Sequence, residues 1–329
     1  MRALVRQDSR VAVLAGMLAF CCTNTFAPAR AEWPDHPITI IVPFSEGGHT
    51  DMVGRLLAAQ LASRFGQNVK VENRMGASAP IELSALLQAT AFGYTLAVTS
   101  NATLASASMD AGVYDLRKDF VPIAYLGAAP NVIVTGKSSG IVSLRDLIAK
   151  AKANPGKLTY SSPGVGTAAQ LAVELLKIRA KIDITHVPFN GSGMSLIAAL
   201  SGSTDISGLN TLGLMHYIRS GELKALAQTG MERWIELPDV PTLAESGFPS
   251  AVLGTSLMIL APAGTPAPII DKLAEKTQEI LQQPDVKAKL LETGFVVNFE
   301  GPDALRARIG REMKTLNEVV ERIGLKKKR

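Results

Sequence analysis

The sequence predicts an α/β fold divided into two lobes. The chain has 329 residues, of which 47% are hydrophobic, and a single domain commonly has roughly 100–200 residues, so the length favours two lobes. Short runs of β-branched residues alternate with longer segments in which apolar residues recur every three or four positions. Strands that alternate with helices in this way form sheets with helices packed on both faces.

The first series of elements begins at residues 38–42, a β-branched and nearly all-apolar run that is typical of a strand buried on both faces. A helix is expected over residues 51–65, with Thr50 as its N-cap and Gly66 at its end. The pattern then predicts a strand, a helix and a strand at residues 69–71, 80–88 and 94–99. This order implies right-handed crossovers and helices on both faces of the sheet.

A second series begins after Pro130 and predicts another α/β lobe. Its expected strands are residues 131–135, 158–161, 184–187 and 205–207, and its expected helices are residues 143–153, 167–177 and 194–200. Residues 257–260 predict a strand that returns to the first lobe, and two amphipathic helices follow at residues 268–282 and 302–323. We therefore expect lobe 1 to comprise residues 32–129 and 251–329, and lobe 2 to comprise residues 130–250.

Residues 1–31 have the pattern of a bacterial secretory signal peptide. A basic segment that ends at Arg10 precedes a ten-residue apolar run, and a small-x-small cleavage pattern ends at Ala31. Ten apolar residues are too few to span a bilayer, which needs about 20. Lipid attachment at Cys21 is the alternative, but the bulky Phe20 occupies a position where such sites have a small residue. We expect secretion with cleavage after Ala31.

Composition excludes several classes of function. The formal net charge is +5, but residues 32–329 carry 30 Lys and Arg against 28 Asp and Glu, and four of these positive residues form the run 326–329. The body has no basic stripe, so we expect no nucleic acid partner. Both cysteines, Cys21 and Cys22, lie in the cleaved segment, and the four histidines lack metal-site spacing. We expect neither a metal nor a cofactor.

One motif leaves an enzyme open as an alternative. Residues 164–169 satisfy the G-x-G-x-x-A pattern of a dinucleotide-binding loop, and Asp183 follows at about the expected distance. The secretion signal, the mid-chain position of the motif and the location of Asp183 before rather than after its strand all disfavour this function. His186 ends a strand and is interpreted as a structural residue rather than a general base. We expect no catalytic residues.

Two glycine-containing loops are the most informative feature of the sequence. In each lobe a strand runs into a glycine turn and a helix start, at residues 43–51 and 161–167. Backbone N–H groups in such loops can approach an anion at the positive end of a helix. Ligands of open α/β sheets bind beyond the carboxyl ends of strands. The two loops therefore predict a clamp for a small carboxylate, although each loop alone is equally compatible with a simple connector.

At these residues the sequence resembles the Bug-type periplasmic solute-binding proteins of tripartite tricarboxylate transporters, from Trp33 to about Val320. The matching segments are Trp33-Pro34-Asp35, residues 37–44, Gly47-Gly48, Thr50-Asp51, residues 71–74, 93–96, Tyr114-Asp115, residues 119–122, Ser161, Gly164, Gly166-Thr167, and residues 186–191, 238–242 and 261–266. So many matching segments in the same order identify the family far more specifically than any single segment does.

The resemblance implies a two-lobed type II periplasmic-binding-protein fold whose cleft takes a di- or tricarboxylate, or a related small acid or amide. It also implies a monomer that delivers this ligand to the membrane permease subunits of the transporter. A periplasmic adaptor that reports the ligand to a two-component sensor kinase is the alternative. The family's ligand-binding positions correspond here to Phe44, Ser45, Gly47, Gly48, Thr50, Ser100, Asn101, Ser161, Gly164, Gly166, Thr167, Asn190, Gly191 and, less certainly in that set, Asp205. Asp51 is interpreted as completing the helix start rather than as a ligand contact.

The sequence also departs from the family pattern. A second glycine-rich loop is reduced to residues 76–80, with Ser78 and Ala79 where glycines are usual, and Gln170 replaces a usual histidine. Leu257 stands near a usual tryptophan, and residues 91–93 replace Pro-Asp-Gly. Glu46 adds a carboxylate to the first loop. If that side chain faced the cleft, it would disfavour a trianionic ligand.

Overall fold

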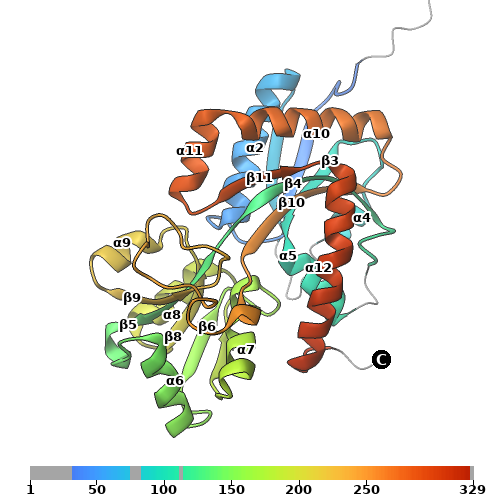
Figure 1. Cartoon of the computed structure of the whole chain (residues 1–329). Helices are drawn as coiled ribbons and strands as arrows, with labels where there is room; N and C mark the ends of the chain where they lie inside the picture. Colours follow the sequence, from blue (N-terminus) through green and yellow to red (C-terminus); the bar gives the residue numbers. More distant parts are fainter. Residues whose placement is uncertain (1–31, 75–82, 111–113, 327–329) are drawn as a thin grey trace, which may run out of the picture. The chain divides into compact units, whose positions relative to one another are not determined.

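The computed structural model describes residues 32–74, 83–110 and 114–326 (Figure 1). The predicted signal peptide therefore lies outside the described residues. Every helix and strand named below belongs to the compact unit formed by residues 36–329. Among the described residues, no helix is both long enough and apolar enough to cross a bilayer.

The first lobe is built on a six-stranded mixed sheet with the order β11-β4-β10-β3-β1-β2. Its strands are β1 (Ile38–Val42), β2 (Val69–Asn73), β3 (Thr95–Ser100), β4 (Phe120–Ala129), β10 (Thr255–Pro262) and β11 (Val296–Glu300). Strand β1 runs parallel to β2 and β3, whereas β10 runs antiparallel to β3 and β4. The returning strand predicted after the second lobe is therefore present in the first sheet, as expected.

The helices of the first lobe are α2 (His49–Phe65), α4 (Ser84–Leu87), α5 (Asn101–Met109), α10 (Ala267–Gln282), α11 (Pro284–Glu292) and α12 (Pro302–Arg322). Figure 1 shows α2 with α10 on one side of the sheet and α5 with α12 on the other. The predicted helix over residues 80–88 appears as the short α4, and part of that prediction lies outside the described residues.

The second lobe is built on a five-stranded mixed sheet with the order β7-β6-β8-β5-β9. Its strands are β5 (Asn131–Gly136), β6 (Thr159–Ser162), β7 (Thr185–Pro188), β8 (Ile206–Asn210) and β9 (Leu223–Gln228). Its helices are α6 (Leu144–Ala153), α7 (Ala168–Ala180), α8 (Ser192–Ser201) and α9 (Leu214–Arg219), and two 3-10 turns lie at Lys137–Ser139 and Pro249–Ala251. In this sheet β5 runs antiparallel to β8 and β9, and β6 runs parallel to β8, so β5 and β6 do not have the parallel arrangement that a simple β-α-β unit would give.

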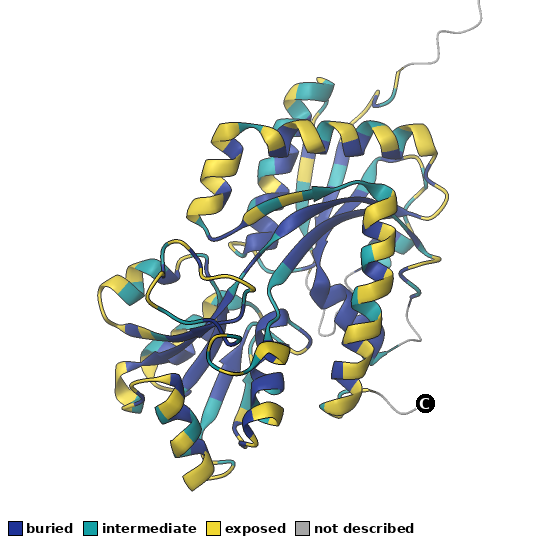
Figure 2. Cartoon of the chain, in the orientation of Figure 1, coloured by how far each residue is buried: buried dark blue, intermediate teal, exposed yellow. Residues whose placement is uncertain are grey.

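The pattern of burial explains which elements the sequence revealed. The central strands of both sheets are dark blue in Figure 2, whereas the edge strands β2, β7 and β11 are partly exposed, and α10 and α12 expose one face. In β1, Ile38, Ile40, Ile41 and Val42 are all buried, as expected of a strand covered on both sides. Helix α2 buries Val53, Leu57 and Leu61 and ends at Gly66, which has the left-handed conformation predicted for that position.

Two segments of chain connect the lobes side by side, immediately before β5 and immediately before β10. Asn131 joins them, because its Nδ2 donates to the Leu253 carbonyl (3.2 Å) and its Oδ1 accepts from Thr255 Oγ1 (3.0 Å). The Asn101 amide donates to the Gly254 carbonyl (2.9 Å), which ties the same crossing to α5. Buried side-chain amides therefore hold together the two segments about which the lobes could move.

Candidate functional site

A cavity of about 690 Å³ lies between the two lobes, and it is lined by residues of both. The starts of four helices meet there: α2 and α5 from the first lobe, and α7 and α8 from the second. Each follows a strand or a short loop after a strand, so the N-termini collect at the carboxyl ends of the strands. Because each helix N-terminus carries a partial positive charge, this arrangement suits an anion.

The start of α2 is open toward a ligand. Thr50 was predicted as the N-cap, but the helix begins at His49 with Gly48 as its N-cap, and no side chain caps it. Thr50 instead lies in the first turn, and Gly48, His49 and Thr50 all line the cavity. A glycine cap adds no acceptor of its own, so first-turn N–H groups of α2 can serve a bound anion.

Asp51 holds the first loop in shape from behind. Its carboxylate accepts hydrogen bonds from Gly47 N–H (3.0 Å), Arg55 Nε (3.0 Å) and Asn73 Nδ2 (2.8 Å). Burial opposes ionisation of Asp51, but the hydrogen bonds from Arg55, Gly47 and Asn73 outweigh it and hold its pKa below the usual value. Asp51 does not line the cavity, which agrees with its interpretation as a residue of the helix start.

Glu46 does not face the cavity. Its side chain is 77% exposed, and its carboxylate lies 3.2 Å from Arg55 Nη2. A solvated carboxylate beside a guanidinium has little influence on a site inside the protein. The condition under which Glu46 would disfavour a trianionic ligand is therefore not met.

The start of α7 is closed by its own side chains. Thr167 Oγ1 caps the helix by accepting from the Gln170 N–H (3.4 Å), and it donates to the Gly164 carbonyl (2.8 Å). Gln170 Oε1 accepts from the Gly166 N–H (3.2 Å). At Gly166, φ is +83°, and a Cβ would lie 2.6 Å from the terminal methyl of Met109. The left-handed φ favours glycine at this position, a side chain there would displace the end of Met109, and the Gly166 N–H is already satisfied.

The start of α8 resembles that of α2. Its N-cap is Gly191, with φ +108° and no side-chain cap. A Cβ at Gly191 would lie 2.3 Å from Ser45 Oγ, so the absence of a side chain lets the loop of lobe 2 approach the first loop of lobe 1. One open helix start from each lobe therefore faces the same cavity.

A carbonyl beside the cavity is shared between the lobes. The Thr293 carbonyl accepts from Thr211 Oγ1 of lobe 2 (2.5 Å) and lies 3.0 Å from His49 Nε2. Because a carbonyl only accepts, Nε2 carries the hydrogen, and Nδ1 has no partner among the described residues. Burial lowers the pKa of His49 to about 4, with the bond to Thr293 opposing the shift. His49 is therefore neutral near pH 7.

Nine of the fourteen predicted ligand residues line the cavity. They are Phe44, Ser45, Gly48, Thr50, Ser100, Gly164, Thr167, Asn190 and Gly191. Two of these use their hydroxyls locally, since Ser100 Oγ caps α5 by accepting from the Ala102 N–H (3.2 Å) and Thr167 caps α7.

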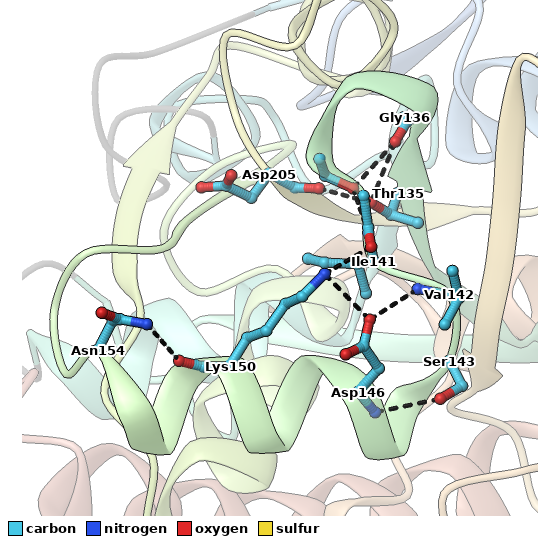
Figure 3. Close-up of polar contacts among 11 residues, drawn as sticks. Thr135, Gly136, Ile141, Val142, Ser143, Asp146, Lys150, Asn154 and Asp205 are labelled. Atoms are coloured by element: carbon cyan, nitrogen blue, oxygen red, sulfur yellow. Dashed lines mark hydrogen bonds and ion pairs between the residues drawn. The ribbon is translucent and has the colours of Figure 1, made fainter.

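Five predicted residues do not line the cavity: Gly47, Asn101, Ser161, Gly166 and Asp205. Ser161 is fully buried and donates to the Ser207 hydroxyl (2.8 Å). Asp205 Oδ2 accepts from the Thr159 N–H (2.7 Å), and Thr135 Oγ1 donates to the Asp205 carbonyl (2.8 Å; Figure 3). These contacts connect neighbouring strands.

Other cavity-lining residues were missed by sequence reasoning. They include His49, Ser106, Met109, Asp110, Asn131, Asn210, Thr255 and Leu325. Asn131 could have been noticed, because it follows Pro130 at the predicted boundary between lobes. Leu325 carries no local signal, since it lies beyond the last predicted helix and reaches the cavity through the packing of α12 on α5.

The residues that suggested enzymatic chemistry have structural roles. The His186 ring stacks on Tyr160 at 4.5 Å between centroids, and its Nε2 lies 2.7 Å from Ser162 Oγ. Burial lowers the pKa of His186 to about 4. Asp183 does not line the cavity. Within the described part of the chain, no group of three or more His, Cys, Asp or Glu could hold a metal ion.

Comparison with known proteins agrees with this geometry. The model of the tripartite tricarboxylate transporter family receptor, TctC, matches residues 53–325. The chain is similar to protein BugT of Bordetella pertussis, at 35% identity over 306 residues that cover 92% of this chain and 94% of the relative.

Two solved structures from Rhodopseudomonas palustris have the same architecture. Rpa4515 with adipate superimposes with a TM-score of 0.84 at 30% identity, covering 89% of this chain and 99% of that one. MatC with bound malate superimposes with a TM-score of 0.81 at 31% identity, covering 88% of this chain and 100% of that one.

Proposed function

Because the chain belongs to the tripartite tricarboxylate transporter receptor family, we propose that it captures a small carboxylated metabolite by lobe closure and delivers it to a membrane permease of the same type. The family is one of periplasmic binding proteins rather than enzymes. Relatives solved with adipate and malate support a carboxylate ligand. The observation that carries the proposal is the pair of open helix starts, α2 and α8, at one cavity.

The proposed ligand contacts are the predicted residues that line the cavity other than Ser100 and Thr167, whose hydroxyls cap α5 and α7, with a carboxylate at the starts of α2 and α8. A helix N-terminus contributes roughly 0.3–1 kcal/mol per charge, and up to about 2 kcal/mol when partly buried. A micromolar ligand requires about 8 kcal/mol. Burial between the lobes and hydrogen bonds, direct or through water, must therefore supply most of the affinity.

We expect the two lobes to close on the ligand, because the proposed contacts come from both lobes and neither lobe alone can enclose it. We place the lobe boundaries near residues 129/130 and 250/251, which flank the crossing joined by Asn131. The proposal includes a cleavable signal peptide ending at Ala31, a monomeric secreted protein and permease subunits as its partners.

The proposal is tested by screening the secreted protein by thermal shift against mono-, di- and tricarboxylates and their amides, followed by calorimetric titration of each hit. We expect at least one acid to raise the melting temperature and to reduce the radius of gyration in X-ray scattering. A bound ligand with an unchanged radius of gyration would overturn the clamp. Uptake of the same acid by cells should be lost on deletion of the chain and restored on its re-expression.

A further inference from the structure

Positive charge is distributed unevenly along the chain. Residues 137–183 contain eight Lys and Arg against three Asp and Glu, which gives this segment a net charge of +5. Residues 32–329 as a whole have a net charge of +2, so the remainder of that range has a net charge of −3. The nearly neutral total therefore conceals an excess of cations in the part of lobe 2 that forms α6, β6 and α7.

Helix α6 lies at the end of lobe 2 that faces away from the cavity. The end of β5, the start of β6 and the residue before β8 meet there, because Asp205 accepts from the Thr159 N–H (2.7 Å) and from Thr135 Oγ1 (2.8 Å). Helix α6 connects the end of β5 to the start of β6 and lies along this end of the sheet (Figure 1). We call this region the basic end of lobe 2.

The end of α7 belongs to the same region. The loops that follow α6 and α7 are joined, since the Gly156 N–H donates to the Asp183 carbonyl (3.1 Å) and Thr185 Oγ1 donates to the Gly156 carbonyl (3.0 Å). Helix α7 begins beside the cavity and has 13 residues, so its last residue, Ala180, lies about 18 Å along the helix from the cavity.

Most cations of the basic end are free to interact with a partner. Lys150 pairs with Asp146 (3.1 Å; Figure 3) and Lys177 pairs with Glu174 (3.1 Å), which accounts for two of the three carboxylates in the segment. The third, Asp183, is exposed. Six exposed cations remain, and within the described part of the chain none of them has an ion pair: Lys137, Arg145, Lys152, Lys157, Arg179 and Lys181.

Carboxylates from neighbouring segments do not offset this charge. Asp205 is half-buried, and its Oδ2 accepts from both the N–H and the hydroxyl of Thr159. Glu222 and Lys224 flank the start of β9 at the same end of the sheet, and their charges cancel. The basic end therefore presents more cations than carboxylates to solvent.

Large apolar side chains are exposed among these cations. Val142, just before α6, is 61% exposed, and Ile178, between Lys177 and Arg179 on α7, is 39% exposed. Cations with exposed apolar side chains between them are typical of surfaces that lie against a bilayer. The cations are spread over two helices and two loops, which suits a fluid anionic surface whose lipids can rearrange, whereas a folded partner requires a complementary shape.

We propose that the basic end of lobe 2 docks on anionic lipid headgroups at the surface of the membrane that holds the permease. The proposal rests on the function proposed above, which places the protein beside that membrane. The attraction acts within about one Debye length, roughly 10 Å at 0.1 M salt, so docking is reversible. Because the cavity lies at the other end of α7, the docked protein can still bind and release its ligand.

Cosedimentation with lipid vesicles tests the proposal. The protein beginning at residue 32 is mixed with vesicles of phosphatidylcholine alone, or of phosphatidylcholine with phosphatidylglycerol, at low and at high salt. We expect at least tenfold tighter binding to the vesicles that contain phosphatidylglycerol at low salt, and loss of this preference at high salt. Equal binding to both kinds of vesicle at low salt, or binding to neither, would overturn the proposal.

Two triple variants with the same change in net charge locate the docking surface. The first reverses charges at the basic end and the second reverses exposed charges on α11 and α12: Lys152→Glu/Lys157→Glu/Lys181→Glu and Lys287→Glu/Lys289→Glu/Lys314→Glu. We expect the first to bind phosphatidylglycerol vesicles at least tenfold more weakly than the wild type and the second to stay within twofold of it. Equal losses in the two variants would assign the binding to net charge and overturn the proposed surface.

Two further measurements distinguish this inference from the proposed function. Both triple variants should bind a carboxylate ligand as the wild type does, because neither changes a residue that lines the cavity. If the first variant retained vesicle binding but lost uptake of the ligand by cells, the partner of the basic end would be an acidic surface of the permease, and a lipid partner would be overturned. A protein that docks on vesicles but binds no carboxylate would instead contradict the proposed function.

Discussion

The loops before α2 and α7 resemble each other in sequence, but their helix starts are satisfied in different ways. At α2 the supporting side chains, Asp51 and Asn73, lie behind the loop and leave the glycine-capped start open. At α7 the hydroxyl of Thr167 caps the helix and Gln170 takes the Gly166 N–H. In lobe 2 the open start belongs instead to α8. A helix N-terminus is thus available to an anion only where the protein's own acceptors leave it free.

The largest effect is expected from a side chain at the open start of α2. Gly48 has an ordinary negative φ and open space around its Cβ position, so Gly48→Val should fold normally. It should nevertheless weaken ligand binding about 100-fold, or about 2.7 kcal/mol, because the branched side chain blocks approach to the first-turn N–H groups. Gly310→Val on α12, also with open space, is the control. Calorimetric affinities that match in the two variants would place the site elsewhere.

Acid should destabilise the first loop through His49. Its pKa is about 4 in the folded protein and 6.5 in the unfolded chain, so the unfolded state binds more protons between these values. The contribution of His49 to the free energy of unfolding is therefore fully present above about pH 6.5 and is lost as the pH drops toward 4. At pH 5 this loss amounts to about 2 kcal/mol. Chemical unfolding of the wild type and of His49→Gln at pH 7 and pH 5 measures this loss of stability. An equal loss in both proteins would assign the acid sensitivity to other groups.

Removing the support behind the first loop should have an intermediate effect. Asp51→Asn removes the charge that pairs with Arg55. It also replaces one acceptor oxygen by an NH2 group, so the side chain cannot accept all three hydrogen bonds. We expect about tenfold weaker binding, because the loop no longer presents the start of α2 in one conformation. Glu46→Gln is the control and should change affinity less than twofold, since that exposed carboxylate contacts Arg55 from the solvent side. A larger effect at Glu46 than at Asp51 would reverse these roles.

The smallest effect on binding is expected at the closed start of α7. Thr167→Ala removes an N-cap and should cost about 1 kcal/mol of folding stability. Its effect on affinity should stay below threefold, because the hydroxyl bonds to the Gln170 N–H and the Gly164 carbonyl. Thermal unfolding and titration of the same variant separate the two quantities. A tenfold loss of affinity would mean that Thr167 contacts the ligand directly.

Sequence periodicity revealed the elements that have one buried face and one exposed face, such as α6, α10 and α12. It failed for α5, where every residue from Asn101 to Ser108 is buried and small polar residues replace large apolar ones. In Figure 2 this helix is dark blue over most of its length. It also missed β4, because Pro122 is unusual in a central strand. The structure accommodates Pro122 beside a register shift in the pairing with β10.

The site was predictable to the extent that it depends on loops with a recognisable sequence. Gly48, Gly164 and Gly191 were found through glycine turns and family resemblance, and all three line the cavity. The different roles of the two loops could not be predicted, since the bond from Gly166 to Gln170 depends on the conformation of one turn. Met109 and Leu325 reach the cavity through long-range packing, for which neither segment carries a local pattern.

The position of Leu325 offers a practical route to an optical sensor. Leu325 lines the cavity, and its neighbour Lys326 is exposed. Residues 32–329 contain no cysteine, so Lys326→Cys would introduce a single thiol for labelling of a protein that begins at residue 32. An environment-sensitive fluorophore at that position would sit beside the cavity wall rather than within the ligand's polar contacts. Its emission would then report occupancy as the surrounding water is displaced, without radioactive ligand and without a reconstituted membrane.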